Sequence, residues 1–379
     1  MKGFALTAAS AALTATAGFA GGIDRSGQDM SILFEEGNYL KFGLITASPD
    51  VPAQAAGFAS QSADSFNSFS FALKKQINEN LSFSLIADEP YGADIRYTDG
   101  PLGSLGLGIA ARLQAPTALG GSGLPAGHPL VAAFAADPNG RALVDSKAIT
   151  ALGRYEFGNG FSVHGGLRAQ KVSGVILSGS GLLDAESDFD FGGVVGVAYE
   201  KPEIAMRVAL TYNSAITHDL EGTHNLLPTI GEVRIPESFN LDFQTGIAQN
   251  TLLFGSIRHV KWNGTKLSTT QGAVTTDWVE FVDDSTTLEL GVGRKLNENW
   301  SIAAMVGYED GADTGTTFLA PTGTSKSIGL GATYTKDAIK VSGGVRYIMF
   351  EDKTVTSAPL SATFDGSAVV AGLSVGISF

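Results

Sequence analysis

Six basic residues occupy one face of segments in which apolar and polar residues alternate. They are Lys74, Arg154, Arg168, Arg207, Arg258 and Arg346. Side chains that alternate with a period of two point to opposite faces of a strand, so these cations lie opposite the apolar face. Asp242 and Glu289 lie on the same inner face and can pair with them. Two chemistries stay open: an ion-pair ladder in an interior, or bidentate capture of a ligand carboxylate by one or two arginines.

The sequence gives no indication of catalysis. His128, His164, His218, His224 and His259 lack the spacing of metal ligands. His259 is close to Ser256, but alternation places the two side chains on opposite faces of a strand, where they cannot act as base and nucleophile. Residues 106–111 match a loose GxGxxA pattern without the βαβ context that makes it a nucleotide site. We predict no enzyme, no cofactor and no metal.

The segments that carry the basic residues are predicted to be strands of a membrane barrel. Residues 204–212 place five large apolar side chains on one face and Arg207 and Thr211 on the other. Residues 369–379 alternate in the same way and end on Phe379. A long final strand with an aromatic end is typical of outer-membrane barrels, in which the last strand closes the cylinder. Alternating lipid-facing and lumen-facing residues produce this pattern.

The connections between the predicted strands alternate between short and long. Short polar turns such as 78–80 and 158–160 have the composition of tight turns. The long connections are 48–64, 98–143, 173–187, 217–233, 264–284, 311–325 and 351–365. This asymmetry favours an all-β, antiparallel transmembrane barrel of about fourteen strands over a soluble β-sandwich. Both termini are then expected in the periplasm, and loop 98–143 outside the cell.

The N-terminus and the composition agree with an exported protein. Residues 1–20 have the features of a secretory signal peptide with cleavage after Ala17 or Ala20, which predicts export through the Sec system. No later apolar stretch reaches the roughly 18 residues of a membrane-spanning helix. A net charge of −13 disfavours nucleic acid as a partner. We expect the outer membrane of a Gram-negative bacterium, with membrane lipid and lipopolysaccharide as surroundings.

The third predicted strand is interrupted at Asp88-Glu89-Pro90-Tyr91-Gly92. Proline donates no ladder hydrogen bond, and a glycine shortly after it is typical of a bulge or kink. The alternative is an ordinary strand end followed by a loop.

Loop 98–143 is unusually apolar for an exposed connection. Residues 129–137 are predicted to form a short helix, with Pro129 in its first turn. Exposing large apolar side chains costs about 25 cal/mol per Å², so we expect the loop to cover the barrel mouth and to offer an apolar groove. The side chains concerned are Leu105, Leu107, Ile109, Leu130, Val131 and Phe134. The alternative is that they pack on one another without a ligand.

Several stretches give the chain a family resemblance. ILFEEGNYLKFG (32–43), LIADEPYGADIRY (85–97) and PESFNLDFQTGIAQNTLLFGSIRHVKW (236–262) resemble the FadL/TodX-type outer-membrane transport proteins. The resemblance implies a monomeric barrel, residues 38–379, that carries long-chain fatty acids or hydrophobic aromatic compounds. It also implies an N-terminal plug, residues 21–37, which is shorter than in better-known members and lacks their Asn-Pro-Ala box.

The resemblance assigns roles to the features described above. The kink at Asp88, Pro90, Tyr91 and Gly92 would be a lateral gate through which an apolar ligand leaves into the membrane. The apolar loop residues would bind the ligand first, and lumen arginines would bind it next. Two alternatives remain: a structural or adhesive barrel that transports nothing, and a general diffusion porin, which the apolar loop disfavours.

Overall fold

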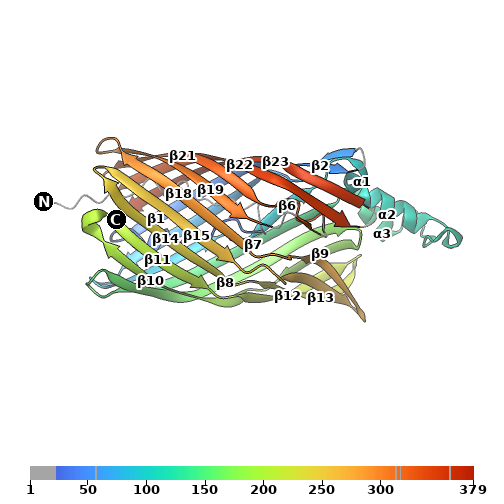
Figure 1. Ribbon diagram of the computed structural model, residues 1–379. Helices are drawn as coiled ribbons and strands as arrows, with labels where there is room; N and C mark the ends of the chain where they lie inside the picture. Colours follow the sequence, from blue (N-terminus) through green and yellow to red (C-terminus); the bar gives the residue numbers. More distant parts are fainter. Residues whose placement is uncertain (1–22, 56–57, 312–313, 316, 358–359) are drawn as a thin grey trace.

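The computed structural model describes residues 23–55, 58–311, 314–315, 317–357 and 360–379. The predicted signal peptide lies outside them. Within the described residues, fourteen strands pair antiparallel in one closed ring, in which β23 pairs with β1 (Figure 1). In chain order these are β1 (Tyr39–Asp50), β4 (Phe66–Gln76), β5 (Leu81–Asp88), β7 (Arg141–Glu156), β8 (Phe161–Ser178), β10 (Asp190–Lys201), β11 (Met206–Asn213), β14 (Ser238–Ala248), β15 (Thr251–Val260), β18 (Ser285–Lys295), β19 (Trp300–Asp310), β21 (Ser325–Lys336), β22 (Ile339–Ser357) and β23 (Leu360–Ser378). The prediction of a fourteen-stranded barrel is confirmed.

The two ends of the barrel differ. One end, called here the turn end, carries tight turns and the C-terminus. The other, the loop end, carries the helices and the remaining strands (Figure 1). The helices are α1 (Gly100–Gly103), α2 (Leu105–Gln114) and α3 (Pro129–Ala136). Of the 3-10 turns, η3 (Thr117–Leu119) lies between α2 and α3, η2 (Ser31–Phe34) lies in the N-terminal segment, and η4 (Pro202–Ile204) lies in the tight connection from β10 to β11. The other strands are β2 (Pro52–Ala55), β3 (Phe58–Gln61), β6 (Gly92–Arg96), β9 (Gly181–Ser187), β12 (Ile216–His224), β13 (Leu227–Ile235), β16 (Lys266–Gln271), β17 (Val274–Glu280) and β20 (Thr314–Gly315).

Strands occupy much of the connections that the sequence predicts as long loops. β2 and β3 lie within 48–64, β22 and β23 extend into 351–365, and five more strands lie in 173–187, 217–233 and 264–284. There β9, β12, β13, β16 and β17 extend the sheet beyond the barrel wall. Residues such as 216–224 are too polar on both faces to resemble lipid-facing strands. They form strands because backbone pairing with their neighbours suffices outside a membrane. Helix α3 matches the helix predicted at 129–137, whereas helix α2 was not predicted.

Alternation along the wall strands separates an apolar outside from a polar inside. In β8, Leu167 is 64% exposed on the outer face, whereas its neighbour Arg168 is 3% exposed. In β23, Leu373 lies outside and Ser374 inside. None of the helices within the described residues is long and apolar enough to span a membrane.

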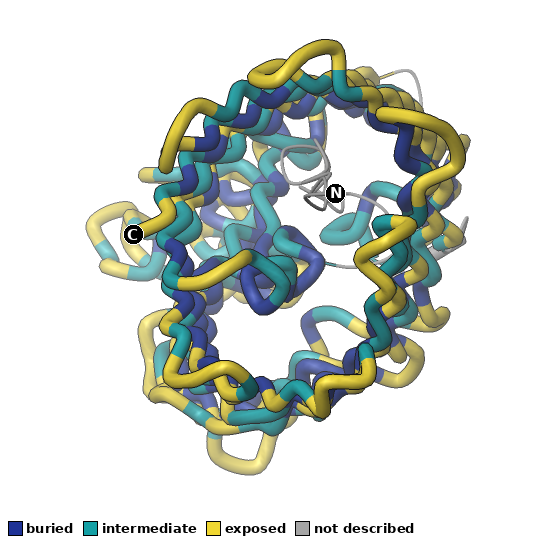
Figure 2. Tube along the Cα trace, turned by 90° about the vertical axis from the view of Figure 1, so that its left-hand side faces the viewer, coloured by how far each residue is buried: buried dark blue, intermediate teal, exposed yellow. Residues whose placement is uncertain are grey.

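The N-terminal segment, residues 23–38, lies inside the barrel. Figure 2, which looks along the barrel, shows buried chain within the ring of strands. Met30, Ile32 and Leu33 pack against inner-wall residues, among them Ile86 and Leu152. This part of the lumen is therefore filled by the chain itself.

The third wall strand is broken, as its sequence predicts. β5 ends at Asp88 and pairs with both β4 and β7. After Glu89-Pro90-Tyr91 the chain resumes as β6, whose ladder pairs with β7 alone among the described strands. Residues Phe66 to Ser70 of β4 pair with β1, and none of the strands in the described part of the chain pairs with their other side. The wall lacks a continuous ladder at this place.

Candidate transport pathway

An apolar cavity of about 80 Å³ lies at the loop end of the lumen. Its walls come from β6, β7, β8, β9, β12, β13, β16 and β17, and Ile23 of the N-terminal segment also contributes. None of the lining residues is charged. They are Ile23, Ala93, Ala142, Val144, Val172, Ser173, Gly174, Ile176, Leu183, Ala185, Leu220, Val233, Ile235, Thr265, Leu267, Val279, Phe281 and Leu319. Such a lining suits a hydrophobic ligand.

These lining residues are not recognisable as a site from the sequence. Leu183 and Ala185 alternate with polar neighbours in 181–187, but Asp184 and Glu186 give the segment the composition of a hydrated loop. The strands that build the cavity also come from connections far apart in the chain. These strands lie together because the ring of wall strands closes, and no local sequence pattern predicts it.

Arg258 anchors the start of the N-terminal segment. Its Nε atom lies 2.5 Å from Asp24 Oδ2, and its Nη1 donates to Asn240 Oδ1 at 2.6 Å. Ser238 donates to Gln28 Oε1 at 2.8 Å and Asn240 donates to the Gly27 carbonyl at 2.8 Å. Together these contacts fix residues 24–28 against β14 and β15.

Further basic residues hold the end of the segment. The guanidinium groups of Arg154 and Arg207 lie 4.6 and 4.4 Å from the centre of the Phe34 ring, within cation–π range. Arg154 Nη1 also donates to the Leu33 carbonyl at 3.0 Å. Lys74 donates to the Glu35 carbonyl at 2.5 Å, and Lys340 pairs with the Glu35 carboxylate at 2.9 Å.

The other two arginines contact the wall. Arg168 Nε donates to Thr150 Oγ1 at 2.9 Å. Arg346 forms an ion pair with Glu289 at 2.7 Å, and both side chains are buried. None of the six basic residues lines the apolar cavity. The six form an interior network of ion pairs, hydrogen bonds and cation–π contacts, in which four hold the plug while Arg168 and Arg346 contact the wall.

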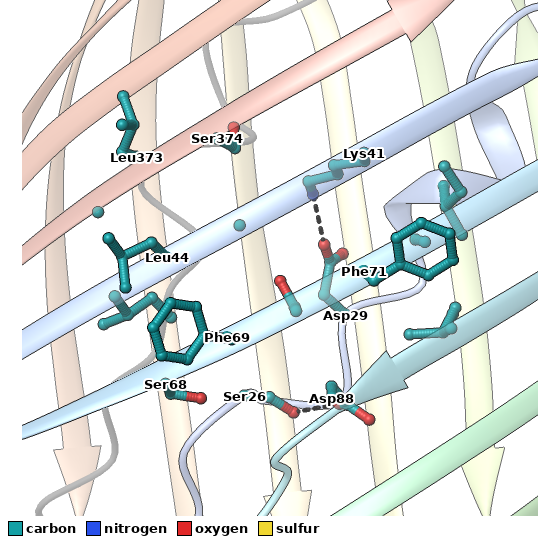
Figure 3. A pocket seen from close by; sticks show the side chains of 17 residues that line it. Ser26, Asp29, Lys41, Leu44, Ser68, Phe69, Phe71, Asp88, Leu373 and Ser374 are labelled. Atoms are coloured by element: carbon teal, nitrogen blue, oxygen red, sulfur yellow. Dashed lines mark hydrogen bonds and ion pairs between the residues drawn. The ribbon is translucent and has the colours of Figure 1, made fainter.

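A second cavity, also of about 80 Å³, lies beside the break in the wall. Its lining includes side chains from the inner face of β1 and β4, such as Ser68 and Ser70, and from the outer face, such as Leu44 and Phe69. Figure 3 shows Asp29 and Ser26 of the N-terminal segment reaching toward Lys41 and Asp88 there. A cavity with lining residues from both faces lies where a route through the wall would pass.

The polar contacts of this second cavity tie the plug to the wall. Lys41 Nζ lies 3.0 Å from Asp29 Oδ2, and the Ser31 amide donates to Asp29 Oδ1 at 2.8 Å. Burial raises the pKa of Asp29, but Lys41 and Ser31 together lower it below its usual value. Asp29 therefore stays ionised and paired at neutral pH.

The gate residues predicted from sequence lie at the break. Asp88 accepts a hydrogen bond from Ser26 at 2.7 Å and lines the second cavity. Tyr91 is fully buried, and its ring contacts that of Trp262 edge-on at 5.8 Å. The Pro90 carbonyl accepts from the Arg25 amide at 2.8 Å, and the Gly92 amide donates to the Ile23 carbonyl at 2.7 Å.

The predicted loop residues gather elsewhere. Val131 and Phe134 of α3 are buried against Leu177 at the end of β8, with Leu105, Ile109 and Leu130 packed around them. Leu107 is 49% exposed. None of the six lines either cavity. The helices thus pack on each other and on β8, and Leu107 alone of the six presents a largely exposed apolar side chain.

One polar cluster has the residue types of a catalytic triad but not its geometry. His218 Nδ1 lies 2.9 Å from Asp190 Oδ2 and 3.4 Å from Ser187 Oγ. A triad needs the aspartate and the nucleophile on different ring nitrogens. Both contacts here use the same nitrogen, so the cluster does not form one. Within the described ranges, no group of three or more acidic or histidine side chains could hold a metal ion.

Solved structures share this fold. A FadL homologue from Pseudomonas aeruginosa covers 92% of each chain with a TM-score of 0.69 at 13% identity. The toluene transporter TodX from Pseudomonas putida covers 91% of this chain and 90% of its own, with a TM-score of 0.60 at 12% identity. The CymD monoaromatic hydrocarbon channel covers 93% and 90%, with a TM-score of 0.56 at 15% identity. At these identities the likeness establishes the fold.

A search of curated proteins gives no match. The family model of outer membrane protein transport proteins (OMPP1/FadL/TodX) matches residues 171–379. That match covers more than half of the chain, and the barrel architecture agrees with it. The chain belongs to this family of outer-membrane transport proteins.

Proposed function

We propose that this protein carries hydrophobic compounds across the outer membrane and has no enzymatic activity. The observation that carries the proposal is the apolar cavity at the loop end, whose lining contains no charged residue. Below it, charged contacts hold the N-terminal segment inside the barrel, where it stands in the way of a straight vertical path. A ligand that prefers an apolar environment gains by entering such a site from water.

Two substrate classes follow from different observations. The family resemblance favours long-chain fatty acids, whose carboxylate would need a cation. The cavity favours a neutral hydrocarbon, because the lumen arginines contact the plug and the wall and none lines the cavity. Two of the similar structures are described as a toluene transporter and a monoaromatic hydrocarbon channel. We therefore give a small neutral aromatic compound as the second candidate.

The proposed exit is lateral, through the break after Asp88. The second cavity supports this route because its lining combines lumen-facing Ser68 with lipid-facing Phe69 and Leu44. The proposed orientation places the turn end in the periplasm and the helices outside. The barrel acts as a monomer, surrounded by membrane lipid and lipopolysaccharide.

An uptake assay tests the function in a strain that lacks other such transporters. Uptake of labelled oleate or toluene that depends on this protein supports the proposal, and the ratio of the two separates the substrate classes. Uptake of sugars alone would identify a diffusion porin. No uptake of any solute by folded, heat-modifiable protein would identify a structural or adhesive barrel.

A further inference from the structure

Residues 23–25 pair with residues 90–92 at the break in the wall, and residues 62–64 pair with β6 beyond them. The Gly92 amide donates to the Ile23 carbonyl at 2.7 Å, the Arg25 amide donates to the Pro90 carbonyl at 2.8 Å, and Asp24 forms an antiparallel bridge with Tyr91. Side chains alternate along an extended segment. Asp24 points into the lumen, toward Arg258, so Arg25 points the opposite way, toward the break.

The Arg25 side chain occupies the space at the break, between β4 and β6. It is 4% exposed. Its guanidinium pairs with Asp94 on β6, lies 3.4 Å from Asp145 on β7, and lies 4.2 Å from the centre of the Phe66 ring on β4. One side chain from the plug thus contacts the strands on both sides of the break.

Gly92 makes room for this arrangement. A Cβ atom at position 92 would overlap the Arg25 guanidinium. Gly92 faces the same side of β6 as Asp94, so the guanidinium crosses the strand directly over the glycine. Glycine is required at position 92 for space and not for backbone conformation, because Gly92 is not among the residues with positive φ.

We propose that Arg25 is the gate residue of the lateral opening, and that an apolar compound passes only when its guanidinium leaves Asp94 and Phe66. The proposal rests on the lateral exit proposed above. A guanidinium in this position blocks an apolar ligand, because the ligand would have to pass a paired charge that offers it no apolar contact. Opening requires movement of this one side chain only, and the strands of the wall stay folded.

Chemical labelling measures the seal without requiring transport. The chain has no cysteine, so Ser68→Cys places a single thiol in the cavity beside the break. Purified protein in lipid vesicles is treated with N-(1-pyrenyl)maleimide, an apolar reagent that partitions into the bilayer. Adding Arg25→Ala should raise the labelling rate by about tenfold, the factor equivalent to about 1.4 kcal/mol. Arg25→Lys, which keeps the charge, should raise it less.

Two controls separate a gate from a loosened plug. Ser327 is also buried and lines a polar cavity between β18, β19, β21 and β22, and labelling of Ser327→Cys should not respond to Arg25→Ala. Glu35→Gln removes a different plug contact, to Lys340, and should leave Ser68→Cys labelling unchanged. Equal acceleration at both thiols, or none at Ser68→Cys in a folded, heat-modifiable variant, would overturn the proposal.

A double-mutant cycle covers the case in which Arg25→Ala does not fold. Asp94→Asn should accelerate labelling of Ser68→Cys on its own, and adding Arg25→Lys should accelerate it little further, because the two residues form one contact. Additive effects would contradict a shared seal. If the unaltered protein takes up no hydrophobic compound, the proposed function fails, whereas the assignment of Arg25 is judged by labelling alone.

Discussion

Asp24 and Arg258 join the beginning of the described chain to a strand 234 residues later, with Oδ2 and Nε 2.5 Å apart. Both side chains are almost completely buried. The pair lies between the apolar cavity, which Ile23 lines, and the basic residues that hold Phe34 and Glu35. The plug therefore has charged anchors at both ends.

Removing the first anchor should release the plug but not the barrel. Asp24→Asn leaves Arg258 buried without its anionic partner, and breaking a buried pair from one side costs about 3–5 kcal/mol. Hydrogen exchange of the amides in 24–34 should accelerate, while wall strands keep their protection. Glu351→Gln, which removes the exposed partner of Lys326, is the control and should change neither region. Unchanged exchange in 24–34 would show that Asp24 is not an anchor.

Filling the apolar cavity should reduce uptake. Ala185→Trp adds an indole to a lining position of β9, and overpacking of this kind typically costs about 1–3 kcal/mol. The barrel wall should stay closed, since β9 is outside the ring of fourteen strands, while the rate of toluene uptake falls severalfold. Ala169→Trp, on the lipid-facing side of β8, is the control. Equal uptake by both variants would show that the apolar cavity is not on the transport pathway.

The barrel can be predicted from the sequence because apolar and polar residues alternate along each wall strand, so that neighbouring residues show which face is outside and which is inside. Leu167 beside Arg168 and Leu373 beside Ser374 already assign an outside and an inside. Pro90 likewise predicted the break after Asp88.

The cavities could not be predicted in the same way. Leu183 and Phe281 line one site although they are nearly a hundred residues apart, and no spacing rule connects them. The role of Arg25 was also hidden, because it depends on the segment 23–25 lying against β6. Both follow from closure of the ring, which brings distant connections together at one end.

The exposed side chain of α2 offers a test of the loop as a first binding site. Leu107→Asp changes a 49% exposed residue of the helical pair and should leave the fold intact. If the loop captures the ligand first, half-maximal uptake should require a higher ligand concentration, with the maximal rate unchanged. Leu119→Asp, 79% exposed in the same loop, is the matched control. Identical behaviour of the two variants would mean that the loop only packs on itself.

The proposed orientation is open to direct labelling, because the native chain has no cysteine. A thiol introduced by Ser122→Cys, at an exposed position in the helical loop, should react in intact cells with a biotin maleimide that does not cross the outer membrane. One introduced by Asn159→Cys, in a tight turn at the other end, should react only after the cells are opened. The reverse pattern would invert the barrel.

If the ligand leaves by the lateral route, blocking the second cavity should stop transport, while the apolar cavity should still bind ligand. Ser68→Trp places an indole in the cavity beside the break, where Ser68 is 6% exposed. Uptake of toluene should fall sharply, whereas binding of toluene to purified protein, measured by calorimetry, should persist because the apolar cavity is separate. Ser327→Trp makes the same change at a buried inner-wall serine that lines the polar cavity away from the break, and should leave uptake unchanged. Since both substitutions add the same bulk to the lumen, a loss confined to Ser68→Trp cannot come from crowding in general. Full uptake by folded Ser68→Trp would instead favour a vertical path past the plug.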